Sequence, residues 1–488
     1  MACDPCTPST SDNGCVAEGA VRDAEPDVAG CQDGGPSGTS TTVGEVSTTV
    51  DPTATTTSEA DTTATTTEGE TSTTSGDCGP CADPTPYCVD GACVGCEELP
   101  GNGCVDLDPE ATVCDPSGRC EQCSADDDTA CTDEQPECID NQCDRCDEHA
   151  QCPDSACNIV EGTCMPVEQV YYVDNGAPGC AMGDGSEAEP FCEVEDALAM
   201  VPMGTGLGTI RVSPGLVYDQ QVAIASGRTV ALMGWDGVPT FEPAASVDAI
   251  TVENATLYIA NVETVDGNSE GSGVLCDAGQ LWIDDSAIRG GMSALIPGIT
   301  VQSCDPVWIR RSSIVGNNGG GVDVNTSVLH VSNTFLAGNG TDGASTVPAV
   351  SLDGASSLDM VYSSVAFNAS EAAGGIRCLM ASSDVDVRNS IVVSADTTTI
   401  GCTAMAASVT YSAIDDGALR GGAEQGNVLV SQEFGDFFDV LDLHLAEGGP
   451  FANVARWIDG DPPTDIDGDP RPSVDGTMDY AGADLPLP

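Results

Sequence analysis

A short signature recurs six times between Ser286 and Ile414, and it constrains the fold more than any other feature of the sequence. Each copy has Ser or Asn, then Ser, Ala or Thr, then a branched or aromatic apolar residue. The copies are Ser286-Ala287-Ile288, Ser312-Ser313-Ile314, Asn333-Thr334-Phe335, Ser363-Ser364-Val365, Asn389-Ser390-Ile391 and Ser412-Ala413-Ile414. Their spacings of 26, 21, 30, 26 and 23 residues, filled with β-forming residues and turns, are typical of the coils of a parallel β-solenoid. Function on such a fold depends on side chains that stack at matching positions of successive coils.

The charge of the chain excludes several classes of partner. The formal net charge is −66, and the cationic side chains are 13 Arg with no Lys. Binding to nucleic acid and attraction to anionic lipid are therefore excluded, as is lysine-based catalysis. The 26 Cys predict an oxidising compartment, so we expect an extracellular or cell-surface protein.

The first residues do not show how the protein is exported. The sequence begins Met1-Ala2-Cys3 without an apolar stretch, and no segment later in the sequence is long and apolar enough for a transmembrane helix. A translation start upstream of Met1 would reconcile this with export. Ala2-Cys3 would then resemble the end of a bacterial lipoprotein processing site, with a lipid anchor on Cys3, although the odd number of remaining Cys argues against it.

Composition divides the N-terminal part into three segments. Residues 1–36 form a short acidic segment that contains Cys, and residues 37–77 are rich in Ser and Thr. Within residues 37–76, 23 of 40 residues are Ser or Thr, with no Leu, Ile, aromatic residue or Cys. Such a composition cannot offset the entropy of ordering, so we expect a disordered stalk, either bare or carrying O-linked sugars.

Residues 78–164 contain 16 Cys in four units of four. We name them Cys unit 1 to Cys unit 4, and they are Cys78/81/88/93, Cys96/104/114/120, Cys123/131/138/143 and Cys146/152/157/164. Turn residues between the last two Cys of most units predict disulfide-stapled hairpins, whose connectivity the sequence leaves open. Zinc is the alternative, because Cys-x2-Cys spacing recurs. We favour disulfides, because His149 is the only nearby His.

A family resemblance begins near Val170. The relevant residues are Tyr171-Tyr172-Val173-Asp174, Gly183-Asp184-Gly185, Pro190-Phe191, a short helix over Glu193–Met200, Gly208–Val212 and, at the far end, Asp465–Pro472 and Asp479–Asp484. This order resembles the right-handed parallel β-helix proteins of the pectin-lyase-like class. The resemblance implies an all-β chain with a parallel β-helix over 165–460 and an Asp-rich closing segment over 461–488. It implies no single activity, because this class contains lyases, hydrolases, epimerases and proteins without known catalysis.

Six Cys of the predicted β-helix fit its coils. Cys276 and Cys304 are 28 residues apart, and Cys378 and Cys402 are 24 residues apart, which is about one coil in each case. Residues one coil apart lie at the strand spacing of about 4.8 Å, within disulfide reach. We expect these two pairs to be bonded, and Cys180 and Cys192 to staple the loop before the first full coil.

Strand alternation places one aromatic residue per coil on the outside of four neighbouring strands. The column is Tyr258, Trp282, Trp308 and His330. Beside it, Asp284 and Asp285 lie one coil from Arg310 and Arg311. This arrangement predicts a carbohydrate platform, with aromatic faces for sugar rings, Arg for uronates and Asp for hydroxyls. The alternative is that aromatic and charge ladders only stabilise neighbouring strands.

The same resemblance sets what catalysis would need. Pectate lyases of this fold abstract a proton with Arg or Lys beside Ca²⁺, which leaves Arg310, Arg311 and Arg388 as weak candidates here. Asp284 and Asp285 alone would supply few ligands for a calcium site. The Gly-His-Gly and Arg-x-Lys motifs of the hydrolases do not occur. Ca²⁺ is the one cofactor that the sequence suggests, as a structural clip at Asp465, Asp467 and Asp469.

The sequence therefore predicts an exported, surface-tethered bacterial β-helix protein. We expect it to bind a glycan or a surface protein without catalysis. The alternative is a polysaccharide lyase or related carbohydrate-active enzyme that acts along the same side of the β-helix.

Overall fold

The computed structural model describes residues 81–486, apart from 82–84, 91, 101–102, 108–110, 112, 115–117, 124–130, 140–141, 245, 266–270, 341–344, 372, 381, 395–397, 403–406, 416–423, 431–440 and 447–448. The predicted stalk (37–77) and the predicted lipid site at Cys3 lie outside the described residues.

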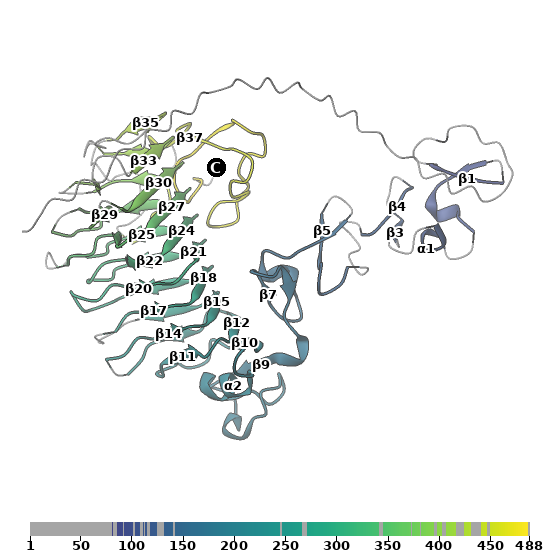
Figure 1. The fold of residues 1–488 in the computed structure, drawn as a ribbon, viewed down its shortest axis with the longest axis horizontal. Coiled ribbons are helices and arrows are strands. Elements are labelled where there is room, and N and C mark those ends of the chain that lie inside the picture. Colours follow the sequence, from purple (N-terminus) through teal and green to yellow (C-terminus); the bar gives the residue numbers. More distant parts are fainter. Residues whose placement is uncertain are drawn as a thin grey trace, which may run out of the picture. The chain divides into compact units, whose positions relative to one another are not determined.

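Three parallel sheets wind around one apolar interior, so the chain contains the predicted parallel β-helix (Figure 1). Sheet 1 consists of β9 (Val170–Val173), β10 (Leu207–Val212), β12 (Thr229–Gly234), β15 (Thr256–Ala260), β18 (Gln280–Asp284), β21 (Val307–Arg310), β24 (Val328–Ser332), β27 (Ser357–Val361), β30 (Asp384–Arg388), β33 (Ala407–Thr410) and β35 (Glu424–Gln425). Sheet 2 consists of β11 (Val222–Ala225), β14 (Ile250–Glu253), β17 (Val274–Asp277), β20 (Ile299–Gln302), β23 (Val322–Asn325), β26 (Val350–Asp353), β29 (Ile376–Cys378) and β32 (Ile400–Gly401). Sheet 3 consists of β13 (Thr240–Phe241), β16 (Glu263–Val265), β19 (Ala287–Arg289), β22 (Ser313–Val315), β25 (Phe335–Ala337), β28 (Ser364–Ala366), β31 (Ile391–Val392), β34 (Ala413–Ile414) and β36 (Val428–Leu429).

The interior of the β-helix is a stack of branched apolar side chains. On sheet 1, Leu257 and Ile259 pair in register with Leu281 and Ile283 of the next coil, and the same pattern continues through β30. These inward residues are at most 2% exposed. Because side chains alternate along a strand, the residues between them face outward on every coil. This parity fixes the position of the outer column described below.

A left-handed residue turns the chain from sheet 1 to sheet 3 in successive coils. These corner residues are Asn261, Asp285, Arg311, Asn333, Tyr362, Asn389 and Tyr411, with φ between 44° and 56°. Asn and Asp occupy this conformation more readily than other non-glycine residues. The Ser or Thr after six of these corners donates its hydroxyl hydrogen to the carbonyl two residues earlier; these residues are Ser286, Ser312, Thr334, Ser363, Ser390 and Ser412.

The hydroxyl ladder explains the recurring signature and corrects its register. In the third and fifth copies the first residue, Asn333 or Asn389, is the corner itself, so the signature is shifted by one position there. As a result Leu336 and Val392 point inward. Phe335 instead packs outside sheet 3 against the C-terminal segment, which we define as the described residues from Leu441 onward. The third signature residue therefore points inward in the other four copies but not in these two, because Asn at the first position is the corner and Ser is the residue after it.

We expect Ser390→Ala to destabilise the β-helix by about 1–2 kcal/mol, because the hydroxyl both donates to one carbonyl and accepts from one amide of the buried ladder. Ser390 donates to the Arg388 carbonyl at 2.8 Å and accepts from the Ser363 amide at 3.1 Å. Guanidinium unfolding measures the change. The matched control is Ser408→Ala on the half-buried surface of β33, and equal costs for the two variants would contradict the role of the ladder.

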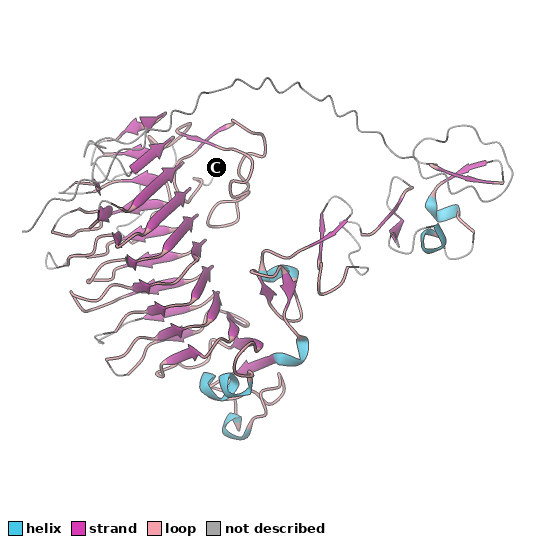
Figure 2. Cartoon of the chain, viewed as in Figure 1, coloured by secondary structure: helices cyan, strands magenta, loops and turns pink. Residues whose placement is uncertain are grey.

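One end of the β-helix is closed by a short helix. Helix α2 (Val194–Met200) buries Val194, Ala197 and Leu198 against the first coils, next to β9, β10 and β11. Figure 2 shows this helix at the end of the stack of strands. The C-terminal segment adds the two-stranded sheet β37 (Ala455–Arg456) and β38 (Met478–Asp479). No helix among the described residues is long and apolar enough to cross a membrane.

The cysteines of the β-helix are bonded across the expected pairs. Disulfides join Cys276 to Cys304 and Cys378 to Cys402 on neighbouring coils, and join Cys180 to Cys192 in the loop after β9.

The Cys units are small disulfide-linked hairpins, described here one by one. Their strands are β1 (Tyr87–Val89) and β2 (Ala92–Val94), β3 (Val113–Cys114) and β4 (Cys120–Glu121), β5 (Glu137–Ile139) and β6 (Gln142–Asp144), and β7 (Cys157–Asn158) and β8 (Thr163–Cys164), with α1 (Cys104–Leu107) in Cys unit 2. In Cys units 2, 3 and 4 the first Cys bonds to the third and the second to the fourth. Cys81–Cys93 in Cys unit 1 follows the same rule. The structure therefore supplies the connectivity that the sequence left open.

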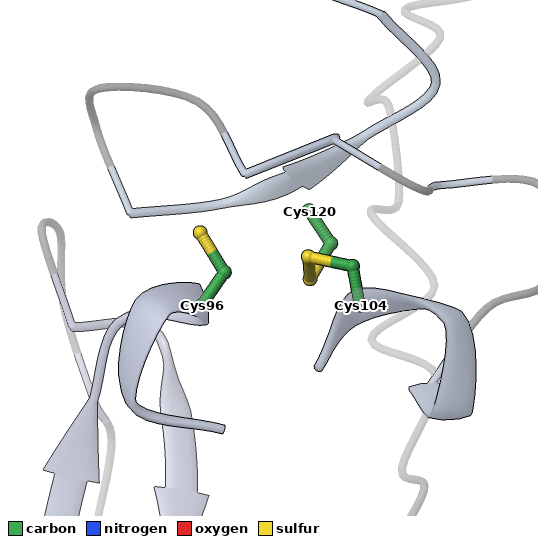
Figure 3. Close-up of side chains that lie close together, drawn as sticks. All are labelled: Cys96, Cys104 and Cys120. Carbon is green, nitrogen blue, oxygen red and sulfur yellow. A yellow bond between two sulfur atoms is a disulfide. The ribbon is translucent and has the colours of Figure 1, made fainter. Parts of the chain in front are cut away.

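Zinc is the rejected alternative for these cysteines. Three sulfur atoms of Cys unit 2 lie within 4.8 Å of one another, as zinc ligands would. Figure 3 shows that Cys104 and Cys120 are joined sulfur to sulfur, with Cys96 beside them. Cys96 itself is bonded to Cys114. Because a disulfide sulfur has no thiolate to offer, this cluster is a pair of bridges rather than a metal site.

Candidate functional site

The predicted outer column exists on sheet 1. Tyr258, Trp282, Trp308 and His330 are direct register partners on β15, β18, β21 and β24. The rings of Tyr258 and Trp282 are 4.9 Å apart and tilted by 45°. The rings of Trp308 and His330 are 4.0 Å apart and nearly parallel. Beyond His330 the column continues to Asp359 and Asp386.

Cys unit 4 packs onto the first part of this column. Its residues Ala156 and Met165 share a buried apolar cluster with Tyr258 and Trp282, and Ile159 packs against the same cluster. The hydroxyl of Tyr258 donates to Asn158 Oδ1 at 2.9 Å and accepts the Val160 amide at 3.3 Å. Arg211 donates to the Pro153 carbonyl at 2.7 Å. Apolar packing and hydrogen bonds therefore both hold Cys unit 4 on sheet 1.

This packing corrects the expectation of an open platform. Tyr258 is 0% exposed and Trp282 is 4% exposed, so neither ring offers a face to a ligand. Strand alternation correctly placed both rings outside the sheet, but Cys unit 4 covers that outer surface. Trp308 and His330 are half-buried and lie where the cover ends. The ligand-binding prediction therefore stays open only for Trp308 and His330.

The stacking of Trp308 on His330 also limits what they offer. When rings stack along the axis of a β-helix at about 4.8 Å per coil, each ring face is covered by the neighbouring ring, and only the ring edges point toward solvent. His330 Nδ1 lies 3.4 Å from a carboxylate oxygen of Asp359. The open column thus provides ring edges, one imidazole and carboxylates. It does not provide a flat aromatic surface.

The predicted charged residues form two ion pairs between coils. Arg310 makes a bidentate pair with Asp284, with Nε–Oδ1 at 2.7 Å and Nη2–Oδ2 at 2.8 Å. Arg311 makes the same arrangement with Asp285, at 2.9 Å and 3.1 Å. Arg311 also reaches Glu148 of Cys unit 4 at 2.9 Å. Both arginines therefore join neighbouring coils of sheet 1, and Arg311 also joins sheet 1 to Cys unit 4.

This environment keeps both arginines protonated. Burial opposes the charge of Arg310, but the hydrogen bonds and negative charge of Asp284 outweigh it and raise the pKa of Arg310. Burial acts in the same way on Arg311, where Asp285 and Glu148 outweigh it and raise its pKa. A proton-abstracting Arg would need the opposite shift. Arg388, the third candidate, is held in a bidentate contact by the buried Asp461. Nothing here supports any of the three as a catalytic base.

His149 of Cys unit 4 is buried within this interface. It is 9% exposed, and its ring lies 5.7 Å from that of Tyr258 in an edge-to-face arrangement. Neither ring nitrogen has a hydrogen-bond partner. Burial lowers the pKa of His149 to about 4. The negative charge of Asp284 opposes this shift, and the positive charge of Arg310 adds to it. The imidazole is therefore neutral at neutral pH.

A cavity of about 380 Å³ lies along the edge of the cover. Its walls include Trp235 and Met233 from the β-helix and Pro153 from Cys unit 4. The charged residues on its walls are Glu148, Arg211, Asp236, Asp284, Asp285 and Arg311. The carboxylates outnumber the arginines, so the cavity carries excess negative charge.

The predicted calcium residues do not gather around one point. The buried carboxylate of Asp465 accepts the amides of Asp467, Asp469 and Leu485, so it caps the closing turn. Asp467 turns instead toward His444, with Nε2–Oδ2 at 3.0 Å. The cluster that the structure brings together is His444, Asp467 and Asp484.

Sequence reasoning missed the part played by Cys unit 4. The sequence placed Glu148, His149 and Asn158 in the Cys-rich module and Met165 at the start of the β-helix, without predicting that they cover sheet 1. One signal was available, because only five residues separate Cys164 from Val170, the start of β9. So short a linker keeps Cys unit 4 close to the first coils.

Comparisons with known proteins match the chain in parts. The model of a family of unknown function, DUF8331, matches residues 60–170, a range that ends at the first residue of β9. No curated protein matches the chain. Among solved structures, the chain is similar to pectate lyase Pel9A, with 12% identity over 64% of this chain and 95% of that chain and a TM-score of 0.34.

Two further solved structures are similar to this chain. The first is a GH136 lacto-N-biosidase from Eubacterium ramulus, at 10% identity over 54% of this chain and 67% of that chain, with a TM-score of 0.29. The second is the pectin methylesterase from Aspergillus niger, at 15% identity over 56% of this chain and 89% of that chain, with a TM-score of 0.21. Similarity at this level carries no information about activity.

Proposed function

We propose that this chain is an extracellular binding protein without catalytic activity, and that the uncovered part of sheet 1 binds a neutral glycan. Ten disulfides join described cysteines, which suits an oxidising compartment. The Ser/Thr-rich residues 37–77, with or without a lipid on Cys3, would tether the β-helix to a cell surface.

The observation that carries the proposal is the division of the column into a covered and an open part. Under the cover, the arginines that a lyase would use are held in bidentate pairs. Beyond it, equivalent positions on four successive strands hold Trp308, His330, Asp359 and Asp386. The two rings are half-buried and the two carboxylates are exposed. A linear ligand along the axis of the β-helix would meet one of them about every 4.8 Å.

The chemistry of the open part favours a neutral ligand. Carboxylates accept hydrogen bonds from sugar hydroxyls, whereas they repel the carboxylates of uronic acids. Exposed Asp384 adds a further negative charge on β30 beside Asp386. The Arg residues that we expected to bind uronates are already paired with Asp284 and Asp285. We therefore expect selectivity against acidic polysaccharides.

The first test is binding of the full-length chain to an array of neutral and uronate-containing glycans, followed by calorimetric titration of the best neutral glycan. We expect Asp359→Ala/Asp386→Ala to weaken binding at least tenfold, or about 1.4 kcal/mol. The matched control is Glu253→Ala/Asp277→Ala, which removes two exposed acids that are register partners on sheet 2. Unchanged binding by the sheet 1 variant, or no bound glycan at all, would refute the proposal.

A lyase remains the competing function. An ultraviolet assay for unsaturated uronate products, with pectate and related polysaccharides as substrates, distinguishes the two. We expect no product, with or without added Ca²⁺. Product that disappears in Arg310→Ala would restore the lyase interpretation.

A further inference from the structure

The C-terminal segment gathers metal-ligating side chains beside sheet 3, away from the covered column. His444, Asp467 and Asp484 each offer one ligand atom, and these atoms all lie within 4.8 Å of one another. His444 Nε2 is 3.0 Å from Asp467 Oδ2. This is the length of a hydrogen-bonded ion pair. Ligand atoms about 2.0–2.1 Å from a zinc ion lie roughly 3–3.5 Å from each other, so a zinc ion replaces this contact with little movement of the two side chains.

The imidazole of His444 is fixed in the orientation that a metal ligand requires. Its Nδ1 contacts the carboxylate of Asp442, which leaves Nε2 directed at Asp467. Its ring packs edge-to-face on Phe335 of β25 at 5.0 Å. Metal-binding histidines commonly hold their second nitrogen against a carboxylate, which fixes the tautomer and strengthens the ligand.

Asp484 is fixed in the same way from a different part of the chain. It is 3% exposed, and its Oδ2 accepts the Leu445 amide at 2.6 Å. Three carboxylates, those of Asp442, Asp467 and Asp484, thus gather around a single imidazole. A divalent cation would neutralise this excess.

The geometry points to a binding site for a divalent transition metal such as Zn²⁺, with His444, Asp467 and Asp484 as ligands. An imidazole nitrogen with two carboxylate oxygens suits zinc, cobalt or manganese, whereas Ca²⁺ takes oxygen ligands. The ion joins three stretches of chain, the first near His444, the second at the closing turn and the third near Asp484. It therefore ties these three stretches of the C-terminal segment to one another, at the place where His444 packs on Phe335 of β25.

Calorimetric titration of the chelator-treated full-length chain with ZnCl₂, in excess CaCl₂ to occupy non-specific acidic sites, tests this site. We expect one strong zinc site in the wild type, which His444→Ala and Asp467→Asn remove. Asp442→Asn, which changes only the carboxylate behind the imidazole, should weaken binding by about 10–100-fold. The matched control is His330→Ala, which removes another His next to an Asp and should bind zinc like the wild type.

Thermal unfolding provides a readout that separates metal binding from misfolding. We expect ZnCl₂ to raise the melting temperature of the wild type and of His330→Ala, and to leave that of His444→Ala and of the second variant, His444→Gln, unchanged. The zinc effect is the difference in melting temperature between the zinc-free and zinc-loaded forms of each protein, so a cost of the substitution itself does not enter the comparison. Equal zinc affinity in His444→Gln and wild type would overturn the site, as would wild-type binding no stronger than that of the His444 variants.

Discussion

Arg310→Ala is expected to destabilise the β-helix by about 3–5 kcal/mol, because it leaves a charge buried without its partner. Asp284 is 2% exposed, and both of its carboxylate oxygens accept hydrogen bonds from Arg310. Without the guanidinium, the carboxylate either stays charged in a dry environment or takes up a proton. Guanidinium unfolding of the oxidised full-length chain measures the loss.

Two companion variants make this prediction specific. Arg310→Ala/Asp284→Ala should be less destabilised than Arg310→Ala alone, since the double variant leaves no orphaned charge. Arg289→Ala, which breaks an ion pair with Glu263 at a side chain that is 52% exposed, should cost at most about 1 kcal/mol. A cost for Arg310→Ala as small as that for Arg289→Ala would show that the Arg310 pair is not buried as described.

Acidification is expected to release Cys unit 4 from sheet 1, because His149 must be neutral in the interface. Its pKa is about 4 when docked and about 6.5 when free in solvent. The free state thus binds the proton more strongly, so docking is unaffected above pH ~6.5 and weakens as the pH falls toward 4. The full difference corresponds to about 3 kcal/mol of docking free energy.

The groups that face His149 do not cancel this effect. Asp284 and Asp285 favour its protonation, but Arg310 and Arg311 oppose it, and burial is the largest influence. Hydrogen exchange of residues 146–165, corrected for the intrinsic dependence on pH, measures docking between pH 4 and 7.5 in steps. His149→Phe keeps a ring of similar shape without a titrating group, and it should stay docked at low pH. The same pH dependence in both proteins would assign the release to other groups.

Much of the β-helix could be predicted because its register depends only on local rules. Alternation along a strand is enough to place Ile283 inward and Trp282 outward, and a coil length is enough to pair Cys276 with Cys304. The signature is out of register where one sequence position has two different structural roles. Asn333 is a left-handed corner and Ser363 is a ladder hydroxyl, yet both precede a small polar residue in the sequence.

The candidate sites were less predictable because separate segments form them. Alternation says on which side of a sheet Trp282 lies, but not that Met165 will cover it. The interface with Cys unit 4 depends on single contacts, such as the hydrogen bond from Tyr258 to Asn158, 100 residues away. The histidine–carboxylate cluster joins His444 to Asp484 through a segment with almost no periodic structure, so no pattern could have placed them together.

Hydroxyl-radical footprinting at neutral pH, read by mass spectrometry, tests most directly whether Cys unit 4 covers the aromatic column. Trp282 and Trp308 are register neighbours on adjacent strands, so each serves as the reference for the other in one sample. With the cover in place, Trp282 and Tyr258 should be strongly protected, while Trp308 should be oxidised several times faster. Equal oxidation of Trp282 and Trp308 would show that the column is open along its whole length and would contradict the covered site.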